Sequence, residues 1–492
     1  MNKYLFRALL LAACLLPCTT LLSRAEPAID RPFVHPLFSD HLILQRNCAV
    51  PVWGWAAPGT KVSVSFAGQC RSAVAGADGK WLARLKAMKP SILPAVMTIS
   101  GDQNQTITIS DVLVGDVWLC SGQSNMEMGM SACEATEDIV TGNFPLIRLL
   151  TVPRRVEKLP ADTADLRWLR CTPEALKQGV FGGFSAASFY FGRQLYRELK
   201  VPIGLIHSSW GGTVAEAWTS LEALEKMESM KERLAVLSNP PQPSTPANPN
   251  ITTVLYNGMI APLLPFAIKG AIWYQGESNA GRACQYRELL PTMINDWRKH
   301  FGVGEFPFYI VQLAAFNARE PQPRENDWAE LREAQALTAR NLGNCGLAVA
   351  IDIGDGKDIH PKNKRDVGVR LALNALARNY GQKVECSGPW YRSMKVKDGA
   401  IRLSFDHARS GLVARSVALK GFAIAGEDKK FVWADARIDG KTVVVASPQI
   451  PKPVAVRYAW DTNPDCNLYN GAGLPAVPFR TDDWPGITKG RH

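Results

Sequence analysis

The stretch Gly-Asp-Val-Trp-Leu-Cys-Ser-Gly-Gln-Ser-Asn-Met, residues 115–126, says most about the fold of this chain. Its apolar run at 117–120 predicts a short buried strand. The small polar residues that follow predict a sharp turn at Gly122, which tolerates backbone angles that other residues resist. Ser124 lies on this turn, and nucleophilic serines are often presented just past the end of a strand. An ordinary polar strand-to-turn junction fits the stretch alone equally well.

Apolar runs alternate with helical patterns between residues 111 and 385. The runs predict strands at 117–120, 203–207, 270–274, 308–313 and 347–353. Spacing of three and four residues predicts helices at 185–199, 285–299, 328–340 and 366–380. This alternation is typical of an α/β fold, in which helices cover both faces of a parallel sheet.

The two flanking regions predict β structure. Short alternating or β-branched runs separated by turns occupy residues 30–110 and again the chain from 386 onward. We therefore expect four parts: a signal peptide at 1–25, an N-terminal β-sandwich domain at 26–110, an α/β domain at 111–385 and a C-terminal β-rich region at 386–492. The Pro-rich stretch 239–249 cannot form a helix or a central strand, so it predicts a surface loop and a candidate lid.

The N-terminus has the pattern of an export signal. A positive start is followed by an apolar stretch, and Ser23-Arg24-Ala25 puts small residues at the expected cleavage positions. The stretch 11–14 also resembles a bacterial lipoprotein box, but it comes very early, so we rank lipidation second. We expect a secreted or periplasmic protein, and after the signal no apolar run is long enough to span a bilayer.

Charge and cysteine content exclude several classes of protein. The formal net charge is +11 over 492 residues, and removing residues 1–25 leaves +8. The basic residues are scattered, and no nucleic-acid module is present. Nine cysteines remain after the signal, so some disulfides are plausible in an exported protein and at least one thiol stays free. No Cys or His spacing fits a metal site.

Polar groups follow four of the predicted strands, at the sheet edge where ligands bind in open α/β folds. Together they supply a nucleophile, backbone donors, a Gln/Glu pair and an Asp/His group: Ser124, Gly211 with Gly212, Gln275 with Glu277, and Asp358 with His360. Enzymes that transfer acyl groups through a serine need this set of groups. Singly, each has a plainer explanation, such as a tight turn for the glycines or a buried polar pair for Gln275 and Glu277. His207, at the end of another strand, is the rival base, but no acid lies near it in sequence.

Several motifs together resemble one family, the sialate O-acetylesterases of the SGNH (GDSL-like) esterase superfamily. The matching segments run in order over nearly the whole chain after the signal: Gly122-Gln-Ser-Asn-Met, Trp210-Gly-Gly-Thr, Trp273-Tyr-Gln-Gly-Glu-Ser-Asn and Asp358-Ile-His-Pro, with flanking matches at 37–46, 255–258 and 474–482. Any one of these motifs is weak, but the ordered set is specific.

The resemblance implies a role for each site residue. Ser124 would be the nucleophile and His360 the general base. The oxyanion hole would come from the Ser124 backbone, a glycine of the pair Gly211-Gly212, and Gln275, where many relatives carry Asn. The chain departs from the superfamily at Lys357, where the usual Asp-x-x-His pattern would place the acid.

The third member of the triad therefore stays open. Asp358 lies one position later than usual and is slightly preferred, because a nearby Asp before the histidine is the usual arrangement. Glu277 is the alternative that the resemblance implies, since some related acetylesterases use the Glu of this motif instead. Asp355 and Asp352 are weaker candidates.

The sequence thus predicts an exported serine esterase that removes O-acetyl groups from sugars, above all from O-acetylated sialic acids. Acetylated xylan or another polysaccharide is the alternative substrate. A non-catalytic glycan-binding protein, which fourteen tryptophans would suit, is the alternative outside enzymes. No metal or organic cofactor is expected, nor a nucleic-acid partner, and the oligomeric state is left open.

Overall fold

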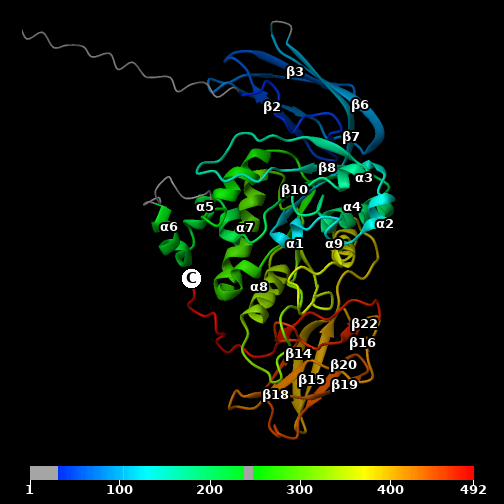
Figure 1. Ribbon diagram of the computed structural model, residues 1–492, viewed down its shortest axis with the longest axis vertical. Coiled ribbons are helices and arrows are strands. Elements are labelled where there is room, and N and C mark those ends of the chain that lie inside the picture. Colours follow the sequence, from blue (N-terminus) through cyan, green and yellow to red (C-terminus); the bar gives the residue numbers. More distant parts are fainter. Residues whose placement is uncertain (1–30, 103–104, 238–247) are drawn as a thin grey trace, which may run out of the picture.

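The computed structural model describes residues 31–102, 105–237 and 248–492 (Figure 1). The signal peptide predicted at 1–25 lies outside the described residues, as does most of the loop predicted at 239–249. None of the described helices combines the length and the apolar character needed to cross a membrane.

The centre of the molecule is the main part of an 11-stranded sheet, seven strands in the order β13-β12-β11-β7-β10-β8-β9. The strands from β13 to β8 pair in parallel, and β9 pairs with β8 in the antiparallel sense. Their bounds are β7 (Thr106–Gly122), β8 (Phe144–Thr151), β9 (Trp168–Cys171), β10 (Ile203–Ser209), β11 (Gly270–Tyr274), β12 (Phe308–Val311) and β13 (Cys345–Ala348).

Each of the five predicted strands overlaps a strand of this sheet, but the sheet is mixed rather than purely parallel. Strands β8 and β9 were missed by the sequence analysis. Arg148 interrupts the apolar pattern of β8 and is nevertheless buried, because its guanidinium pairs with Asp111 at 3.0 Å. A buried ion pair of this kind is invisible to a search for apolar runs.

Helices cover both faces of the central sheet. Helices α4 (Ala186–Leu199) and α9 (Lys364–Asn379) pack on one face, against Trp118 and Leu205. Helices α7 (Ala283–Phe301) and α8 (Asp327–Asn341) pack on the other, against Leu119. Trp118 and Leu119 are chain neighbours that point to opposite faces, as strand geometry requires. Shorter helices are α1 (Ser124–Glu127), α2 (Thr136–Val140), α3 (Pro173–Leu176), α5 (Leu221–Leu224) and α6 (Lys231–Leu237).

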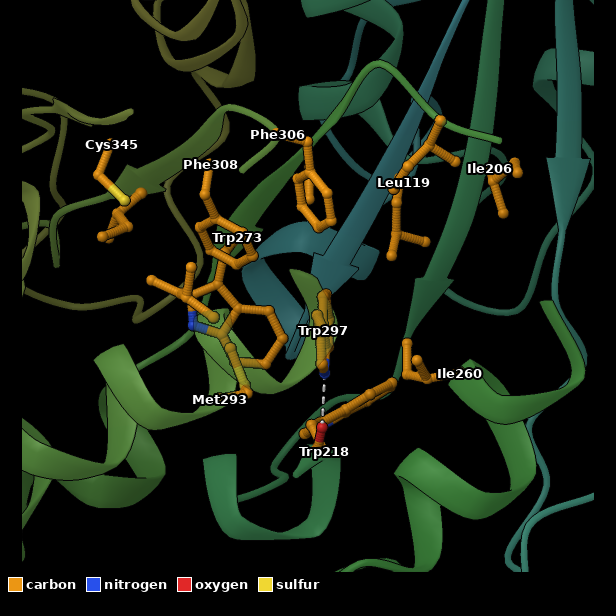
Figure 2. Packing of buried hydrophobic residues seen from close by; sticks show 14 of the residues in the cluster. Leu119, Ile206, Trp218, Ile260, Trp273, Met293, Trp297, Phe306, Phe308 and Cys345 are labelled. Carbon is orange, nitrogen blue, oxygen red and sulfur yellow. Dashed lines mark hydrogen bonds between the residues drawn. The ribbon is translucent and has the colours of Figure 1, made fainter. Parts of the chain in front are cut away.

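Tryptophans dominate the core beneath α7. Figure 2 shows Trp273 of β11, Trp297 of α7 and Trp218 packed together with strand residues such as Leu119 and Ile206. The ring of Trp273 meets those of Trp218 and Trp297 edge to face, at centroid separations of 6.1 and 5.6 Å. The indole of Trp297 donates to the carbonyl of Trp218 at 2.9 Å, so its one polar atom is satisfied in the core.

Six strands precede β7. They are β1 (Ile43–Gln45), β2 (Val50–Trp55), β3 (Lys61–Phe66), β4 (Gln69–Val74), β5 (Lys80–Leu85) and β6 (Ser91–Ser100). Strands β2 and β5 pair with each other in a separate two-stranded sheet, and the other four join the central sheet through β7. Strand β7 pairs with β6 and β1 in its first part, and with β10 and β11 from residue 116 onward. The boundary predicted at 110/111 falls inside this 17-residue strand, and the division into domains stays a prediction.

The C-terminal region holds separate β-sheets, ordered β14-β15-β20-β19, β18-β17-β21-β23 and β16-β22. Their strands are β14 (Trp390–Lys397), β15 (Ala400–Asp406), β16 (Leu412–Ala414), β17 (Phe422–Ala425), β18 (Phe431–Trp433), β19 (Asp435–Asp439), β20 (Thr442–Ala446), β21 (Ala455–Tyr458), β22 (Leu468–Asn470) and β23 (Phe479–Arg480).

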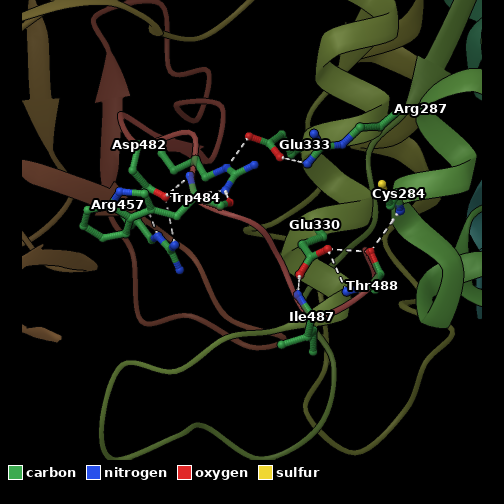
Figure 3. A network of polar contacts seen from close by, with 10 residues as sticks. Cys284, Arg287, Glu330, Glu333, Arg457, Asp482, Trp484, Ile487 and Thr488 are labelled. Carbon is green, nitrogen blue, oxygen red and sulfur yellow. Dashed lines mark hydrogen bonds and ion pairs between the residues drawn. The ribbon is translucent and has the colours of Figure 1, made fainter. Parts of the chain in front are cut away.

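The last residues of the chain return to the central α/β region (Figure 3). The N–H of Ile487 donates to Glu330 of α8 at 2.6 Å, and the N–H of Cys284 in α7 donates to the hydroxyl of Thr488 at 2.9 Å. Thr488 is fully buried. The tail thereby ties the C-terminal β region to the helices on one face of the sheet.

The disulfides that export made plausible do not form among the described residues, whose nine cysteines are all unpaired. Five of them are buried in the protein: Cys120, Cys133, Cys171, Cys345 and Cys386. Burial raises the pKa of the Cys120 thiol to about 12, so this side chain behaves as a small apolar residue.

Candidate active site

Ser124 lies where β7 ends at the carboxyl edge of the sheet. The strand ends at Gly122, and Ser124 opens α1. Gly122 has a φ of +142°, and a Cβ added there would lie 2.1 Å from the carbonyl oxygen of Tyr274 on the neighbouring strand. Only glycine fits this turn. The turn leaves the Ser124 side chain partly exposed at the edge where the five strands parallel to β7 also end.

Ser124 and His360 are in contact although 236 residues separate them in the chain. The Oγ of Ser124 lies 2.9 Å from the Nε2 of His360, which sits on the loop between β13 and α9. The imidazole meets the ring of Phe181 edge to face, 5.4 Å between centroids. Partial burial holds the pKa of His360 below its usual value of 6.5; the charge of Asp358 opposes this shift and that of Lys364 adds to it. A neutral imidazole here can accept the serine proton.

Of the two predicted acids, Asp358 is the one near this histidine. Its Oδ1 lies 3.4 Å from Nδ1 of His360 and accepts the backbone N–H of the same residue at 2.9 Å. The contact with Nδ1 is longer than an ordinary hydrogen bond, and the Asp358 side chain is 52% exposed. Glu277 forms no ion pair with His360 within 4.0 Å; its Oε1 accepts the side-chain N–H of Asn125 at 2.6 Å.

The weaker acid candidates are engaged elsewhere. Asp352 makes a two-pronged ion pair with Arg370 at 2.6 and 2.8 Å. Asp355 accepts the backbone N–H of Lys357 at 2.8 Å and so closes its own turn. Burial raises the pKa of Glu277, whose Oε2 is buried with no hydrogen-bond partner among the described residues. Asp358 is therefore the carboxylate that the geometry places to orient His360.

Two buried side chains hold the loop on either side of His360. The amide nitrogen of Asn125 donates to the carbonyl of Ile359 at 3.0 Å. The ammonium of Lys364, which is fully buried, donates to the carbonyl of Pro361 at 2.6 Å and to Oδ1 of Asn125 at 2.7 Å. Because the carbonyls that flank His360 are both bonded, the imidazole is fixed relative to Ser124. Burial lowers the pKa of Lys364 to about 8.

The predicted oxyanion donors are not all free. The N–H of Gly211 donates to Oε2 of Glu127 at 2.9 Å, and the other oxygen of Glu127 lies 2.6 Å from the guanidinium of Arg154. A Cβ added to Gly211 would lie only 3.1 Å from the Cβ of Ser124, so this glycine is close to the serine. In the described structure, the N–H groups of Ser124 and Gly212 take part in no hydrogen bond.

Gln275 has another role in this geometry. Its amide nitrogen donates to the carbonyl of Thr213 at 3.1 Å and to Oδ1 of Asn279 at 2.6 Å. Its oxygen accepts the hydroxyl of Tyr286 at 2.8 Å. Both amide protons are used and the side chain is fully buried, so Gln275 braces two loops here instead of offering a free donor to Ser124.

His207, the rival base, does not reach Ser124. It is buried and bonds the hydroxyl of Ser209, two residues further along the same strand. Burial lowers the pKa of His207 to about 4, so the imidazole stays neutral at ordinary pH.

Four contact residues were missed by the sequence analysis. Asn125 lies inside the Gly-Gln-Ser-Asn-Met motif, and that motif could have pointed to it. Glu127, Arg154 and Lys364 had no local signal, because their roles depend on contacts between distant segments. Among residues 31–102, 105–237 and 248–492, no three His, Cys, Asp or Glu side chains gather in a way that would hold a metal ion.

Comparison with known proteins identifies the family of this chain. Residues 114–377 match a family model described as "Carbohydrate esterase, sialic acid-specific acetylesterase". The chain is 33% identical to the sialate O-acetylesterase of Pongo abelii and 34% identical to that of Homo sapiens, in each case over 91% of this chain and 92% of the relative.

A solved structure is also similar over most of the chain. The crystal structure of a carbohydrate acetylesterase from Xanthomonas citri shares 39% sequence identity and superposes with a TM-score of 0.83. The match covers 92% of this chain and 100% of that one. With its family model, its curated relatives and its structural neighbour in agreement, this chain belongs to the sialic acid-specific acetylesterase family of carbohydrate esterases and is an esterase.

Proposed function

We propose that the protein is an exported serine esterase that removes O-acetyl groups from sugars, above all from O-acetylated sialic acids. One observation carries the catalytic part: the 2.9 Å contact between Ser124 Oγ and His360 Nε2 at the carboxyl edge of the sheet. The family match supports the acetylated sugar as substrate. The α/β region is assigned to the SGNH hydrolase type on the order of its motifs, and export rests on the N-terminal sequence pattern.

Acylation begins at Ser124. Its Oγ attacks the carbonyl carbon of the acetyl group while Nε2 of His360 takes the hydroxyl proton. The tetrahedral intermediate carries a negative charge on the former carbonyl oxygen. When it collapses, the bond to the sugar oxygen breaks and His360 returns the proton to that oxygen. The sugar leaves as an alcohol, and Ser124 keeps the acetyl group as an ester.

Deacylation repeats the same proton transfers with water. His360 Nε2 takes a proton from a water molecule, whose oxygen attacks the acetyl carbonyl. Collapse of the second intermediate breaks the bond to Oγ and returns the proton to Ser124. Acetate is released, and the protein's residues are restored.

The backbone N–H groups of Ser124 and Gly212 are the candidate oxyanion donors in the described geometry. The N–H of Gly211 can join them only when it is no longer bonded to Glu127, because it donates to the carboxylate of Glu127 in this structure. A negatively charged carboxylate close to the developing oxyanion would repel it and raise the energy of the tetrahedral intermediate. We therefore expect the Glu127 side chain to move toward Arg154, its other partner, when substrate binds.

Asn125 and Lys364 act as positioning residues for the base. They bond the carbonyls of Ile359 and Pro361, and the positive charge of Lys364 lowers the pKa of His360. Both effects favour a neutral imidazole aligned on Ser124. Asp358 orients the same ring from the Nδ1 side.

A paired assay tests the substrate. Purified enzyme is given 9-O-acetyl sialic acid and acetylated xylan side by side, and acetate release is measured. The proposal expects a higher kcat/KM on the sialic acid. A clear preference for xylan would make the protein a polysaccharide esterase, and the name of the Xanthomonas citri relative, a carbohydrate acetylesterase, gives that second candidate its support. Ser124→Ala is the control: loss of both activities in this variant would show that the candidate site catalyses them and that a contaminating enzyme does not.

A further inference from the structure

Two cavities lie side by side in the C-terminal β region. Their volumes are about 350 and 390 Å³, and Gly421 and Trp433 line both of them. Strands β17 and β18 form one wall, and the segment 319–325, which belongs to the loop between β12 and α8, contributes the other. None of the residues placed at the candidate active site lines either cavity.

Trp433 separates the two cavities and is fixed in place. Its side chain is 40% exposed, and its indole N–H donates to the carbonyl of Pro321 at 2.9 Å. Because the only polar atom of the ring is already bonded, the exposed part of the side chain is apolar. An anchored aromatic ring in a concave site that also carries polar side chains is the kind of surface on which the apolar face of a sugar ring stacks.

The wall of the first cavity is rigid. The guanidinium of Arg457 lies 4.2 Å from the ring centre of Phe431 and 5.1 Å from that of Trp460. Arg457 is also bonded to Asp482 at 2.9 Å, which Figure 3 shows, and to Glu325 at 2.8 Å. Side chains held by several contacts lose little further freedom when a ligand binds, so this wall is preorganised.

Polar side chains line both cavities. Lys429 and Lys430 line the first cavity, and among the described residues neither is in an ion pair. Asn463 lines the second cavity, where its Nδ2 already donates to the carbonyl of Asn317 at 2.6 Å and its side-chain oxygen can accept a hydroxyl. The lining thus combines a stacking surface with polar groups that suit hydroxyls, which is the combination a carbohydrate needs.

The second cavity reaches the loop that carries His360. A Cβ added to Gly356 would lie 2.9 Å from Nδ2 of Asn463, so the two residues are in contact. Gly356 precedes His360 by four residues, a length of chain that spans at most about 14 Å. A residue that lines the second cavity therefore contacts the same loop that carries the candidate base His360.

We propose that these paired cavities bind the glycan chain to which the acetylated sugar is attached, with Trp433 as the stacking surface. The proposal rests on the proposed function, because it names the part of the substrate beyond the reacting sugar. It implies that the protein acts on acetyl groups carried by oligosaccharides or polysaccharides, and that the C-terminal β region contributes to substrate recognition.

Binding of unacetylated glycans tests the proposal without any ester chemistry. The full-length Ser124→Ala protein is titrated calorimetrically with xylohexaose, cellohexaose and 3′-sialyllactose. At least one should bind, and Trp433→Ala in the same background should weaken that binding about tenfold or more, the equivalent of about 1.4 kcal/mol. Val413→Ala is the matched control, because Val413 is 40% exposed in the same region and lines neither cavity.

Two results would overturn the proposal: no binding of any of the three glycans, or binding that Trp433→Ala leaves unchanged. Circular dichroism and thermal unfolding check that the variant is folded. If it is not, Lys430→Ala replaces it, because this exposed side chain has no ion pair to lose. Its loss should weaken binding several-fold, and unchanged binding would again count against the proposal.

Kinetics give a second, independent reading. Trp433→Ala in the active protein should raise KM for an acetylated polysaccharide and leave kcat unchanged, while both constants for 4-nitrophenyl acetate stay as in the parent. Failure of the proposed function would appear differently, as 4-nitrophenyl acetate hydrolysis that does not depend on Ser124. Equal KM values for parent and variant on the polysaccharide would contradict a role for the cavities.

Discussion

Among the described residues, two histidines touch a serine hydroxyl, and we propose that only His360 is placed for catalysis. His207 bonds Ser209 inside the sheet, where both side chains are buried. His360 bonds Ser124 at the sheet edge, where both are partly exposed and a carboxylate lies behind the ring. The comparison teaches that a His–Ser contact is not by itself a catalytic pair. Access for substrate and a group that stabilises the charged imidazole distinguish the two.

The largest expected contrast is between the two serines. Ser124→Ala should lower kcat on 4-nitrophenyl acetate by about 10⁶-fold, the usual effect of losing a nucleophile. Ser209→Ala removes only a partner of a buried histidine, and kcat should stay within about threefold of the parent. Steady-state assays with matched thermal unfolding curves measure both. Near-parental activity of a folded Ser124→Ala protein would refute the assignment.

The histidines should differ almost as much. His360→Ala removes the base and should lower kcat by about 10⁴-fold or more. His207→Ala leaves a cavity and an unpaired hydroxyl, so its main effect should be a fall of about 1–3 kcal/mol in the free energy of unfolding. Urea denaturation and initial rates separate these outcomes. An inactive but stable His207→Ala protein would show that the wrong histidine was chosen.

The two candidate acids allow a finer test. Asp358→Asn should lower kcat by about 10- to 10³-fold, less than the ~10⁴-fold typical of a buried triad acid, because this carboxylate is half exposed. Glu277→Gln keeps an oxygen that can accept the bond from Asn125, so we expect a change of less than about tenfold. If Glu277→Gln lowers kcat more than Asp358→Asn does, Glu277 is the acid. If both variants react at the parental rate, catalysis uses only the pair Ser124 and His360.

The smallest expected effect concerns the pH profile. Activity should rise with pH as His360 loses its proton, and the rise should lie below pH 6.5, because the pKa of His360 is lowered. Lys364 contributes to that lowering, so Lys364→Met should move the rise to higher pH and reduce kcat without changing KM. Lys362→Met is the matched control: this exposed lysine lies on the same loop as His360 and pairs with Glu134, which lies between α1 and α2.

Two outcomes of that experiment would count against the positioning role. One is a Lys364→Met profile that coincides with that of the parent. The other is an equal displacement by Lys362→Met. Above pH 8 a second change is expected, because the pKa of Lys364 is about 8 and the neutral amine donates weaker hydrogen bonds to the carbonyl of Pro361 and to Asn125, which hold the loop of His360 in place.

The local pattern of the sequence was enough to predict five of the seven strands on the central path of the sheet and the four long helices. Strand β11 has the predicted bounds, Gly270–Tyr274, because it is a continuous apolar run closed by polar residues. Strand β8 was missed because the charged Arg148 interrupts its apolar run. The charge is neutralised by Asp111, which is distant in the sequence and close only in the folded structure. Local reasoning fails where distant charges are buried together.

The candidate site likewise has features that the sequence predicts and features that it does not. Ser124 and His360 each follow a strand, and the ends of parallel strands meet at one sheet edge, so their proximity could be predicted. The bond between Gly211 and Glu127 could not, nor could the use of both Gln275 amide protons inside a loop brace. Both depend on how side chains from distant segments of the chain point toward one another, and no periodic pattern in the sequence records this.

The central claim is that Ser124 is the nucleophile activated by His360. A fluorophosphonate probe, which bonds covalently to activated serines, followed by peptide mass spectrometry tests it directly. The account predicts that the label appears on Ser124, that His360→Ala strongly slows labelling, and that His207→Ala does not. A label on any other residue, or labelling of Ser124→Ala at the parental rate, would contradict it.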